Sequence, residues 1–163
     1  NMMLQQRLNP STKEAPKPSI QRSGTEYRLH DKVMQIKNDY DREVFNGDIG
    51  TITEVNTDDQ ELTITFDGRE VSYEKSDLSA VVLAYATTIH KAQGSEYPIV
   101  VLPFMMTHFV MLQRNLLYTA VTRAKKALVL IGEQKAISYA IRNQKQLERN
   151  TQLAERLGML ETN

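Results

Sequence analysis

Residues 87–97, TTIHKAQGSEY, bring together hydroxyl, imidazole, ammonium, amide and carboxylate side chains just before an apolar stretch. Gly94 allows the backbone to approach a ligand closely, and the amides beside it can form an anion-binding nest. Four further donors lie in the same stretch: Thr87, Thr88, Lys91 and Ser95. These groups suit a phosphate-bearing ligand, although a well-capped turn would use the same residue types. The carboxylate of Glu96 would repel phosphate, so it suits a ribose or base hydroxyl, or an orienting contact to a base.

A second candidate for chemistry is Arg123, in the stretch QRNLLYTAVTRAKKALVLIG. It follows a predicted helix and precedes an apolar strand, so its backbone is expected to be rigid. The planar guanidinium group can form two parallel hydrogen bonds to a phosphate. The alternative is that Arg123 and the two lysines close behind it only complement the negative end of the helix. Tyr118 and Thr122 are expected to serve helix packing and local hydrogen bonding.

The composition is that of an ordinary globular protein, with 40% hydrophobic and 25% charged residues among 163. No apolar run reaches transmembrane length, and the start shows no secretory signal pattern. The absence of cysteine excludes disulfides and thiolate metal sites, and no metal site is predicted. The formal net charge of zero conceals an asymmetry, because residues 27–80 hold 13 of the 20 acidic but 6 of the 20 basic residues. Only the remainder has the sign expected for phosphate contacts.

The elements that must position these residues differ between the two halves of the chain. The first half opens on a predicted helix that Asn9-Pro10 ends, and residues 10–26 are rich in proline and read as a linker or a poorly ordered loop. From residue 27 to residue 80, short strands alternate with turns. Two dipeptides are strong tight-turn signals: Asn46-Gly47 and Asp67-Gly68. An alternating apolar pattern marks one half-buried strand: Leu62, Ile64 and Phe66. Strands this short and close predict a small barrel.

After residue 80, continuous apolar strands alternate with helices. The stretches AVVLAYA, YPIVVLPF and KALVLIG predict three buried strands, and Gly132 ends the third. Apolar residues at helical spacing predict a helix before that strand: Phe109, Leu112, Leu116, Leu117 and Ala120. A further helical pattern begins at residue 133. Such alternation is typical of a parallel sheet, so the barrel is an insert within an α/β domain.

The acidic balance of the barrel argues against one broad phosphate-binding face. One side could still offer single-stranded DNA a surface for base stacking. The candidate cations and aromatic residues of this surface are Lys32, Lys37, Arg42, Arg69, Tyr40, Phe45 and Tyr73. Core packing would explain Tyr73 equally well.

Four blocks, in order along the chain, resemble RecD-like superfamily 1 DNA helicases. TIHKAQGSEY is similar to their motif V, and LLYTAVTRAKKALVLIG to their motif VI. MMLQQRLNP resembles the helix that follows motif IV. HDKVMQIKNDYDREVFNGDIG resembles the segment that introduces an SH3-like barrel inserted in the second RecA-like domain, with His30 where those helicases have glycine.

The resemblance implies an α/β fold, with a partial RecA-like parallel sheet domain and an inserted small SH3-like β-barrel. Residues 1–26 would be the start of the second RecA-like domain and the linker. Residues 27–80 would be the barrel. Residues 81–163 would be the remainder of the RecA-like domain, with C-terminal helices.

The same resemblance implies an ATP-dependent 5′→3′ DNA helicase and assigns roles to single residues. Arg123 would be the catalytic arginine finger at the γ-phosphoryl group. The nucleotide would contact Gln93, Gly94 and Glu96 as well as Arg123. Four residues of motif V would contact single-stranded DNA: Thr87, Thr88, His90 and Lys91. For His90, a neutral ring packed within the loop is the alternative.

No GxxxxGKS or GxxxxGKT phosphate loop occurs in the sequence, and no DExx-type carboxylates precede the linker. The resemblance therefore implies a C-terminal fragment that is inactive alone and shares ATP and Mg²⁺ with the first RecA-like domain of the same polypeptide. Nuclease-complex subunits would be further partners, no membrane would be involved, and the location would be the bacterial cytoplasm. The alternative is a non-catalytic nucleic-acid-binding module in which the barrel binds and the α/β part is scaffold.

Overall fold

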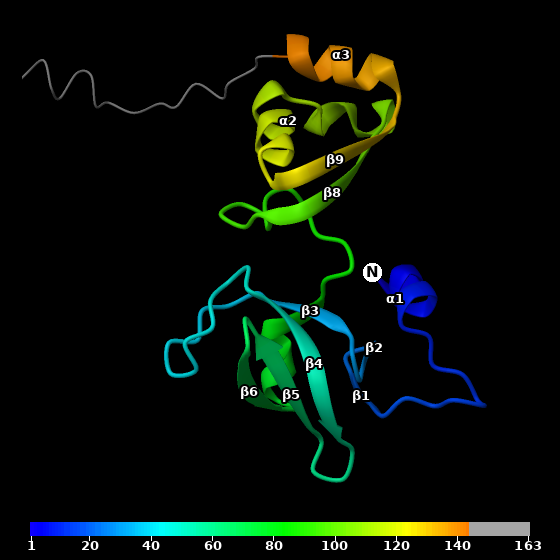
Figure 1. Ribbon diagram of the computed structural model, residues 1–163, viewed down its shortest axis with the longest axis vertical. Coiled ribbons are helices and arrows are strands. Elements are labelled where there is room, and N and C mark those ends of the chain that lie inside the picture. The colour runs from blue at the N-terminus through cyan, green and yellow to red at the C-terminus, as the bar shows by residue number, and fades with distance from the viewer. Residues whose placement is uncertain (144–163) are drawn as a thin grey trace, which may run out of the picture. The chain divides into compact units, whose positions relative to one another are not determined.

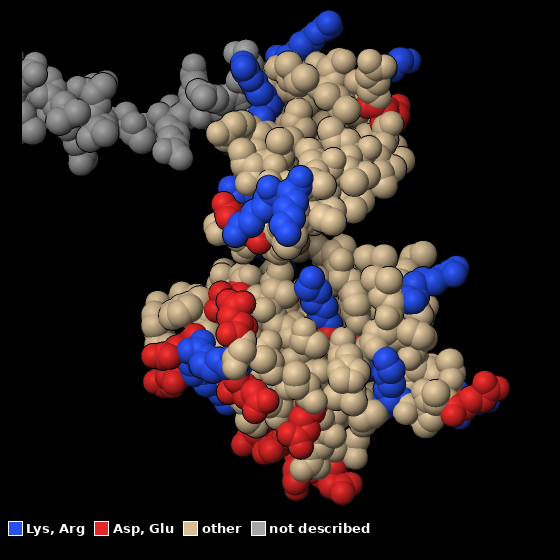
Figure 2. Space-filling model, in the orientation of Figure 1, with Lys and Arg blue, Asp and Glu red and all other residues tan. Residues whose placement is uncertain are grey.

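The computed structural model describes residues 1–143, which fall into two compact units divided between Glu96 and Tyr97 (Figure 1). The elements of the first unit are α1 (Met2–Leu8), β1 (Ser19–Arg22), β2 (Thr25–Arg28), β3 (Lys32–Gln35), β4 (Ile49–Asn56), β5 (Glu61–Phe66), β6 (Arg69–Glu74), η1 (Asp77–Ala80) and β7 (Val81–Leu83). Those of the second are β8 (Tyr97–Phe104), η2 (Met106–Met111), α2 (Arg114–Val121), β9 (Ala124–Gly132) and α3 (Gln134–Arg142). Figure 2 shows acidic side chains gathered on the first unit, as the charge asymmetry predicts.

The first unit is built on one antiparallel five-stranded sheet with the order β6-β5-β4-β3-β7. The predicted tight turn joins β5 to β6, because Asp67 and Gly68 both take positive φ, +46° and +85°, as a two-residue hairpin loop requires. The strand β5 alternates as predicted, with Leu62, Ile64 and Phe66 buried. The predicted small barrel is present only as an open sheet, because β6 and β7 remain its two edges among the described residues.

The linker predicted for residues 10–26 contains ordered structure that the proline content concealed. Strands β1 and β2 form an antiparallel hairpin, turned at Ser23 and Gly24 with φ of +48° and +79°. Ile20 from β1 and Tyr27 from β2 are both buried in the core of the unit. Burial of these two large side chains stabilises the hairpin, so the segment does not behave as a free linker.

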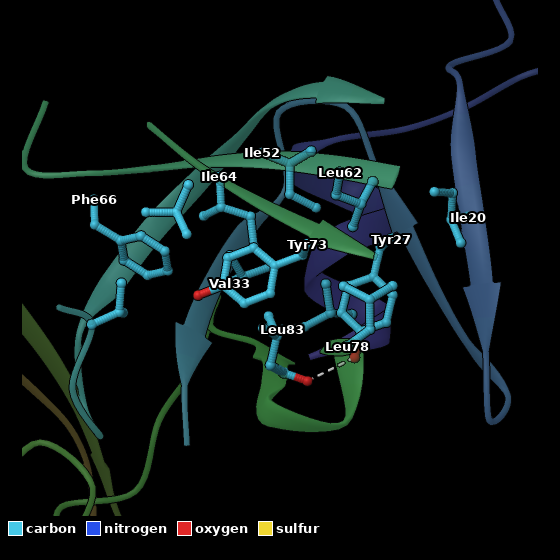
Figure 3. Packing of buried hydrophobic residues seen from close by; sticks show 13 residues of the cluster. Ile20, Tyr27, Val33, Ile52, Leu62, Ile64, Phe66, Tyr73, Leu78 and Leu83 are labelled. Atoms are coloured by element: carbon cyan, nitrogen blue, oxygen red, sulfur yellow. Dashed lines mark hydrogen bonds between the residues drawn. The ribbon is translucent and has the colours of Figure 1, made fainter. Parts of the chain in front are cut away.

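The core of the first unit lies between the hairpin, the sheet and η1 (Figure 3). Its fully buried members include Val33, Ile52, Ile64 and Tyr73. Tyr27 spans this core, and its hydroxyl donates to the Val81 carbonyl at 2.8 Å, which fixes β7 against the hairpin.

The stretch AVVLAYA does not join a parallel sheet, contrary to prediction. Only residues 81–83 of it are extended, and they pair antiparallel with β3, with Val33 opposite Leu83. A short apolar run can form a strand in a parallel or an antiparallel sheet. Here it pairs with the free edge of β3.

The second unit contains the predicted parallel pairing, although in two strands only. Strands β8 and β9 run parallel, with Val101 opposite Val129, and Gly132 ends β9 as expected. Leu102 and Phe104 are buried on one side, where α2 and α3 bury Leu116, Ala120, Ala136 and Ala140. The other side of the strands is exposed: Ile99 61%, Val101 59%, Val129 44% and Ile131 54%. The described residues thus show part of an α/β layer and no complete RecA-like sheet.

The helix predicted through residues 109–120 is divided into the 3₁₀ segment η2 and the α-helix α2. The helical pattern predicted after residue 133 is confirmed for α3, and its continuation beyond residue 143 lies outside the described residues. None of the helices described in residues 1–143 is long and apolar enough to cross a membrane.

Candidate nucleic-acid interface

Residues 87–96, whose sequence resembles motif V and which we call the motif V loop, form a turn-rich loop after β7. Thr88 organises it, since its carbonyl accepts from the Ala92 amide at 3.0 Å and its Oγ1 accepts from the Lys91 amide at 3.3 Å. Ala92 is the buried residue of the loop. Gly94 takes φ of +86°, a conformation that other residues adopt at a cost, and the space around it is open. The loop is therefore held as a defined turn with an exposed outer face.

Three of the four residues predicted to contact DNA line one pocket of about 270 Å³ in the first unit: Thr87, Thr88 and Lys91. The pocket offers two hydroxyl groups and one ammonium group beside an apolar floor that includes Met34 and Val82. His90 is exposed and does not line this pocket. Because His90 is exposed, its degree of burial does not support the alternative of a neutral ring packed within the loop.

The residues predicted to contact the nucleotide lie further along the same loop. Gln93, Gly94 and Glu96 are all exposed and lie outside the lining of the pocket. The amide of Gln93 donates to the His90 carbonyl at 3.3 Å, which continues the turn. Residues 87–91 thus contribute to the pocket lining through Thr87, Thr88 and Lys91, whereas residues 93–96 do not, and we call these the pocket-lining half and the exposed half of the loop.

The position of this loop depends on polar groups that the sequence pattern did not reveal. The side chain of Asn1 bonds the Ala86 backbone twice, donating to its carbonyl at 3.0 Å and accepting from its amide at 2.8 Å. The Tyr85 hydroxyl donates to Asp31 at 2.8 Å. Burial, followed by this hydrogen bond, raises the pKa of Tyr85 to about 12. Residues 85 and 86, immediately before the DNA-contact candidates, are thereby fixed to α1 and to β3.

Asp31 is the centre of this network and is fully buried. Its two oxygens accept hydrogen bonds from four donors: Gln5 Nε2 at 2.5 Å, Asn9 Nδ2 at 2.7 Å, the Arg28 amide at 2.7 Å and the Tyr85 hydroxyl. Gln5 and Asn9 belong to the first helix and its end, so one carboxylate joins α1, the β1-β2 hairpin and the end of β7. Buried polar residues of this kind follow no periodicity, and no spacing in the sequence marked them.

The stacking surface predicted on the barrel survives only in part. Tyr73 is fully buried, its hydroxyl donates to Gln35 at 3.1 Å, and burial raises its pKa to about 12, so it is a core residue. Arg42 lies 5.1 Å from the centre of the Tyr73 ring and pairs with Asp39 and Asp77 at 3.1 and 2.6 Å.

The remaining aromatic residues of that surface are exposed, Tyr40 by 74% and Phe45 by 45%. Both belong to residues 38–48, which we call the 38–48 loop. Its Gly47 adjoins the motif V loop, because a Cβ at this glycine would lie 3.7 Å from the Lys91 carbonyl oxygen. The 38–48 loop and the DNA-contact candidates are therefore neighbours within one unit.

Arg123 belongs to the second unit and follows the last turn of α2. Its Nε donates to the Thr119 carbonyl at 3.1 Å and its Nη2 to Thr122 Oγ1 at 3.3 Å. These are the contacts of the helix-end alternative, whereas its role at a γ-phosphoryl group stays a prediction. Thr122 bonds locally as expected, to the Thr119 carbonyl at 3.0 Å. Tyr118 is 71% exposed, so the expectation that it packs against the helix is wrong.

Two family models match the chain in succession. Residues 1–66 match the SH3 domain of ATP-dependent RecD-like DNA helicases, and residues 83–131 match the UvrD-like helicase C-terminal domain. The ATP-dependent RecD2 DNA helicase of Deinococcus radiodurans is 41% identical over 132 residues, which are 81% of this chain and 18% of that protein. The RecBCD enzyme subunit RecD of Haemophilus influenzae is 32% identical over 121 residues, covering 74% of this chain and 18% of that protein.

Solved structures show the same fold relationship. A Bacteroides Pif1 helicase in complex with ADP-AlF3 and single-stranded DNA is similar with a TM-score of 0.55 at 18% identity, over 88% of this chain and 37% of that one. A Pif1 helicase studied at forked duplex DNA gives 0.56 at 21% identity, over 87% and 37%. The chain spans about a fifth of the length of the two curated relatives named above, RecD2 and RecD. On the two family matches and these relatives, the chain belongs to the RecD-like superfamily 1 DNA helicases.

Proposed function

We propose that the chain is the C-terminal motor region of an ATP-dependent 5′→3′ DNA helicase, to which it supplies motifs V and VI. The observation that carries the proposal is the gathering of Thr87, Thr88 and Lys91 around one pocket. Relatives named as ATP-dependent DNA helicases support it, as does the similarity of fold to a Pif1 helicase bound to ADP-AlF3 and single-stranded DNA.

In this proposal the pocket-lining half of the motif V loop holds the single strand. The hydroxyl groups of Thr87 and Thr88 donate to backbone phosphates, and Lys91 adds positive charge. A neutral donor binds phosphate more weakly than a charged one, so it does not hold the strand too tightly for translocation. His90 stands exposed beside them and supplies a further donor. The network through Asn1 and Tyr85 fixes the start of the loop, so that these donors are positioned before the strand arrives.

The exposed half of the same loop would face the nucleotide through Gln93, Gly94 and Glu96. Open space around Gly94 leaves its backbone accessible to a ligand. Among residues 1–143, no cluster of three or more His, Asp or Glu side chains could hold a metal ion. The phosphate loop and the ligands of Mg²⁺ would therefore come from the first RecA-like domain of the same polypeptide.

Arg123 would complete that shared site when the two domains close on ATP. It would then exchange the Thr119 carbonyl for oxygens of the γ-phosphoryl group and stabilise the charge that develops during transfer to water. The exposed apolar face of β8 and β9 supports a larger domain, since Ile99, Val101 and Ile131 would be covered by further elements of the same polypeptide.

The binding of single-stranded DNA tests the proposal directly. The 163-residue chain should bind oligo(dT), and hydrogen exchange in residues 87–92 should slow on binding. Replacing Lys91 by alanine should lower the slope of log affinity against log salt by about 0.7, the value for one phosphate contact to a single strand. The matched control is Lys75→Ala, because Lys75 is also exposed but bonds Gln60 in another part of the sheet.

The chain alone should hydrolyse no ATP above background, with or without DNA, because it carries no phosphate loop. Unchanged exchange at residues 87–92 in the presence of oligo(dT), or an equal salt slope for Lys91→Ala and wild type, would contradict the assignment of this loop. Binding that protects only the five-stranded sheet would favour the alternative of a non-catalytic nucleic-acid-binding module.

A further inference from the structure

The 38–48 loop presents two aromatic rings to solvent as a pair. The rings of Tyr40 and Phe45 lie edge to face, with centroids 6.0 Å apart and an interplanar angle of 73°. They are exposed by 74% and 45%. Aromatic rings held outward on a loop offer flat apolar surface to a ligand that can stack on it.

The loop that carries the pair is held rigidly by its own hydrogen bonds. Asp39 and Val44 form an antiparallel bridge, with N···O distances of 2.7 and 3.0 Å. The Asn38 side chain accepts from the Asn46 amide at 2.9 Å and donates to the Tyr40 hydroxyl at 3.3 Å. A ligand that stacks here would not have to order the loop first, which removes one cost of binding.

Three of the four acidic residues of the loop are occupied in building it. Asp39 pairs with Arg42, Glu43 pairs with Arg69 at 2.7 Å, and the Asp48 side chain accepts from the Phe45 amide at 2.8 Å. Their charges are thus largely offset by neighbouring arginines or committed to backbone amides. Pairing with arginine reduces the repulsion that the phosphates of a strand would meet beside the rings.

We propose that Tyr40 and Phe45 form a stacking site for the bases of single-stranded nucleic acid. The strand would continue onto the motif V loop, which adjoins the same loop at Gly47 and Lys91. Phosphates would contact residues 87–91, and bases would stack on the rings without regard to sequence. This inference rests on the proposed function, since it extends the path of the same strand.

The test compares oligo(dT) affinity of the whole chain and its variants. Stacking contributes about 1–3 kcal/mol per base, so Tyr40→Ala and Phe45→Ala should each weaken binding about 5-fold to 150-fold. Their salt slopes should stay as in the wild type, because no phosphate contact is lost. Tyr40→Phe keeps the ring and should bind normally. The matched control is Tyr118→Ala, which removes a tyrosine that is 71% exposed on the second unit. Binding to oligo(U) in parallel separates a preference for DNA from general stacking.

The possible outcomes separate the two proposals. Wild-type affinity in both alanine variants, with a reduced salt slope in Lys91→Ala, would overturn the stacking site and leave the proposed function intact. Absence of any oligo(dT) binding by the wild-type chain would overturn the proposed function and the stacking site together. A loss of affinity in Tyr40→Ala that Tyr40→Phe restores would support the inference and exclude a folding defect.

Discussion

Replacing Asp31 with asparagine should destabilise the first unit more than any single surface change. Oδ1 of this buried carboxylate accepts from Asn9 and Tyr85, and Oδ2 accepts from Gln5 and the Arg28 amide. An asparagine keeps one acceptor oxygen and places an amino group, itself a donor, where the other oxygen stood. In the rotated orientation the amino group faces Asn9 Nδ2 and the Tyr85 hydroxyl, and the hydroxyl can accept from it, so at least one buried donor, that of Asn9, is left unsatisfied.

The magnitude follows from the donor that loses its partner in this orientation. A buried donor left unsatisfied costs about 1–3 kcal/mol, so Asp31→Asn should lower the free energy of unfolding by at least about 1–3 kcal/mol. Tyr85→Phe removes one hydroxyl from the same carboxylate and leaves no donor unsatisfied. It should therefore cost less, about 0.5–1.5 kcal/mol. The ratio between the two variants tests the network and does not depend on either absolute value.

Urea denaturation monitored by hydrogen exchange measures these losses for each unit separately. Amides of β4 and β5 report on the first unit, and amides of β8 and β9 serve as the internal control. We expect a lower urea midpoint for the first unit in Asp31→Asn, with an unchanged slope. A midpoint equal to that of the wild type would refute the reasoning that Asp31 satisfies four buried donors.

Two further predictions concern the same unit. Burial raises the pKa of Tyr73 to about 12, raises that of Tyr85 to about 12 together with its bond to Asp31, and also raises that of Tyr27. Since each folded pKa exceeds the unfolded value of 10.0, the associated stability is present below that pH and lost as pH rises through the folded value. In an alkaline absorbance titration, three of the seven tyrosines should ionise late; a single normal transition would contradict this burial. Gly50→Ala would place a Cβ 2.6 Å from Ile64 Cγ2 and should cost about 1–3 kcal/mol; an unchanged melting temperature would contradict that packing.

Elements were predicted correctly from the sequence where the local sequence pattern and the tertiary packing favour the same structure. The Asp67-Gly68 turn and the alternation of Leu62, Ile64 and Phe66 each specify the β5-β6 hairpin without help from distant residues. The parallel pairing of YPIVVLPF with KALVLIG was predictable because both runs are long and apolar throughout. Such segments have one arrangement that satisfies both the backbone and the side chains.

The misread elements were those decided by contacts between distant parts of the chain. Ile20 is a lone apolar residue in a proline-rich stretch, and only its place in the core shows that a strand forms there. The stretch AVVLAYA pairs with β3 because that edge is available, which no local pattern records. The hydrogen bonds of Asp31 were equally unpredictable, because its four donors come from three separate segments of the chain.

Sequence reasoning proposed the candidate site as a set of residues and not as an arrangement. The residues that resemble motif V form a loop, and three of the four DNA-contact candidates among them line one pocket. The hydrogen bonds from Asn1 and Tyr85 that fix the loop were not predictable, because they depend on how α1 docks. Tyr73 was predicted as part of the stacking surface but is buried in the core. The sequence pattern could not show this, because exposure depends on how the whole unit folds.

The central claim is that Arg123 serves ATP hydrolysis in a shared site, and one measurement tests it most directly. The assay is DNA-stimulated ATP turnover by a polypeptide that joins this chain to a phosphate-loop domain. Arg123→Ala should reduce turnover by roughly 10³–10⁵-fold while the affinities for nucleotide and DNA change little, because the guanidinium acts mainly in the transition state. Lys126→Ala, on the same segment, should be nearly silent. Normal turnover in Arg123→Ala with a lower melting temperature would contradict the account, because the contact with the Thr119 carbonyl would then be the whole role of Arg123.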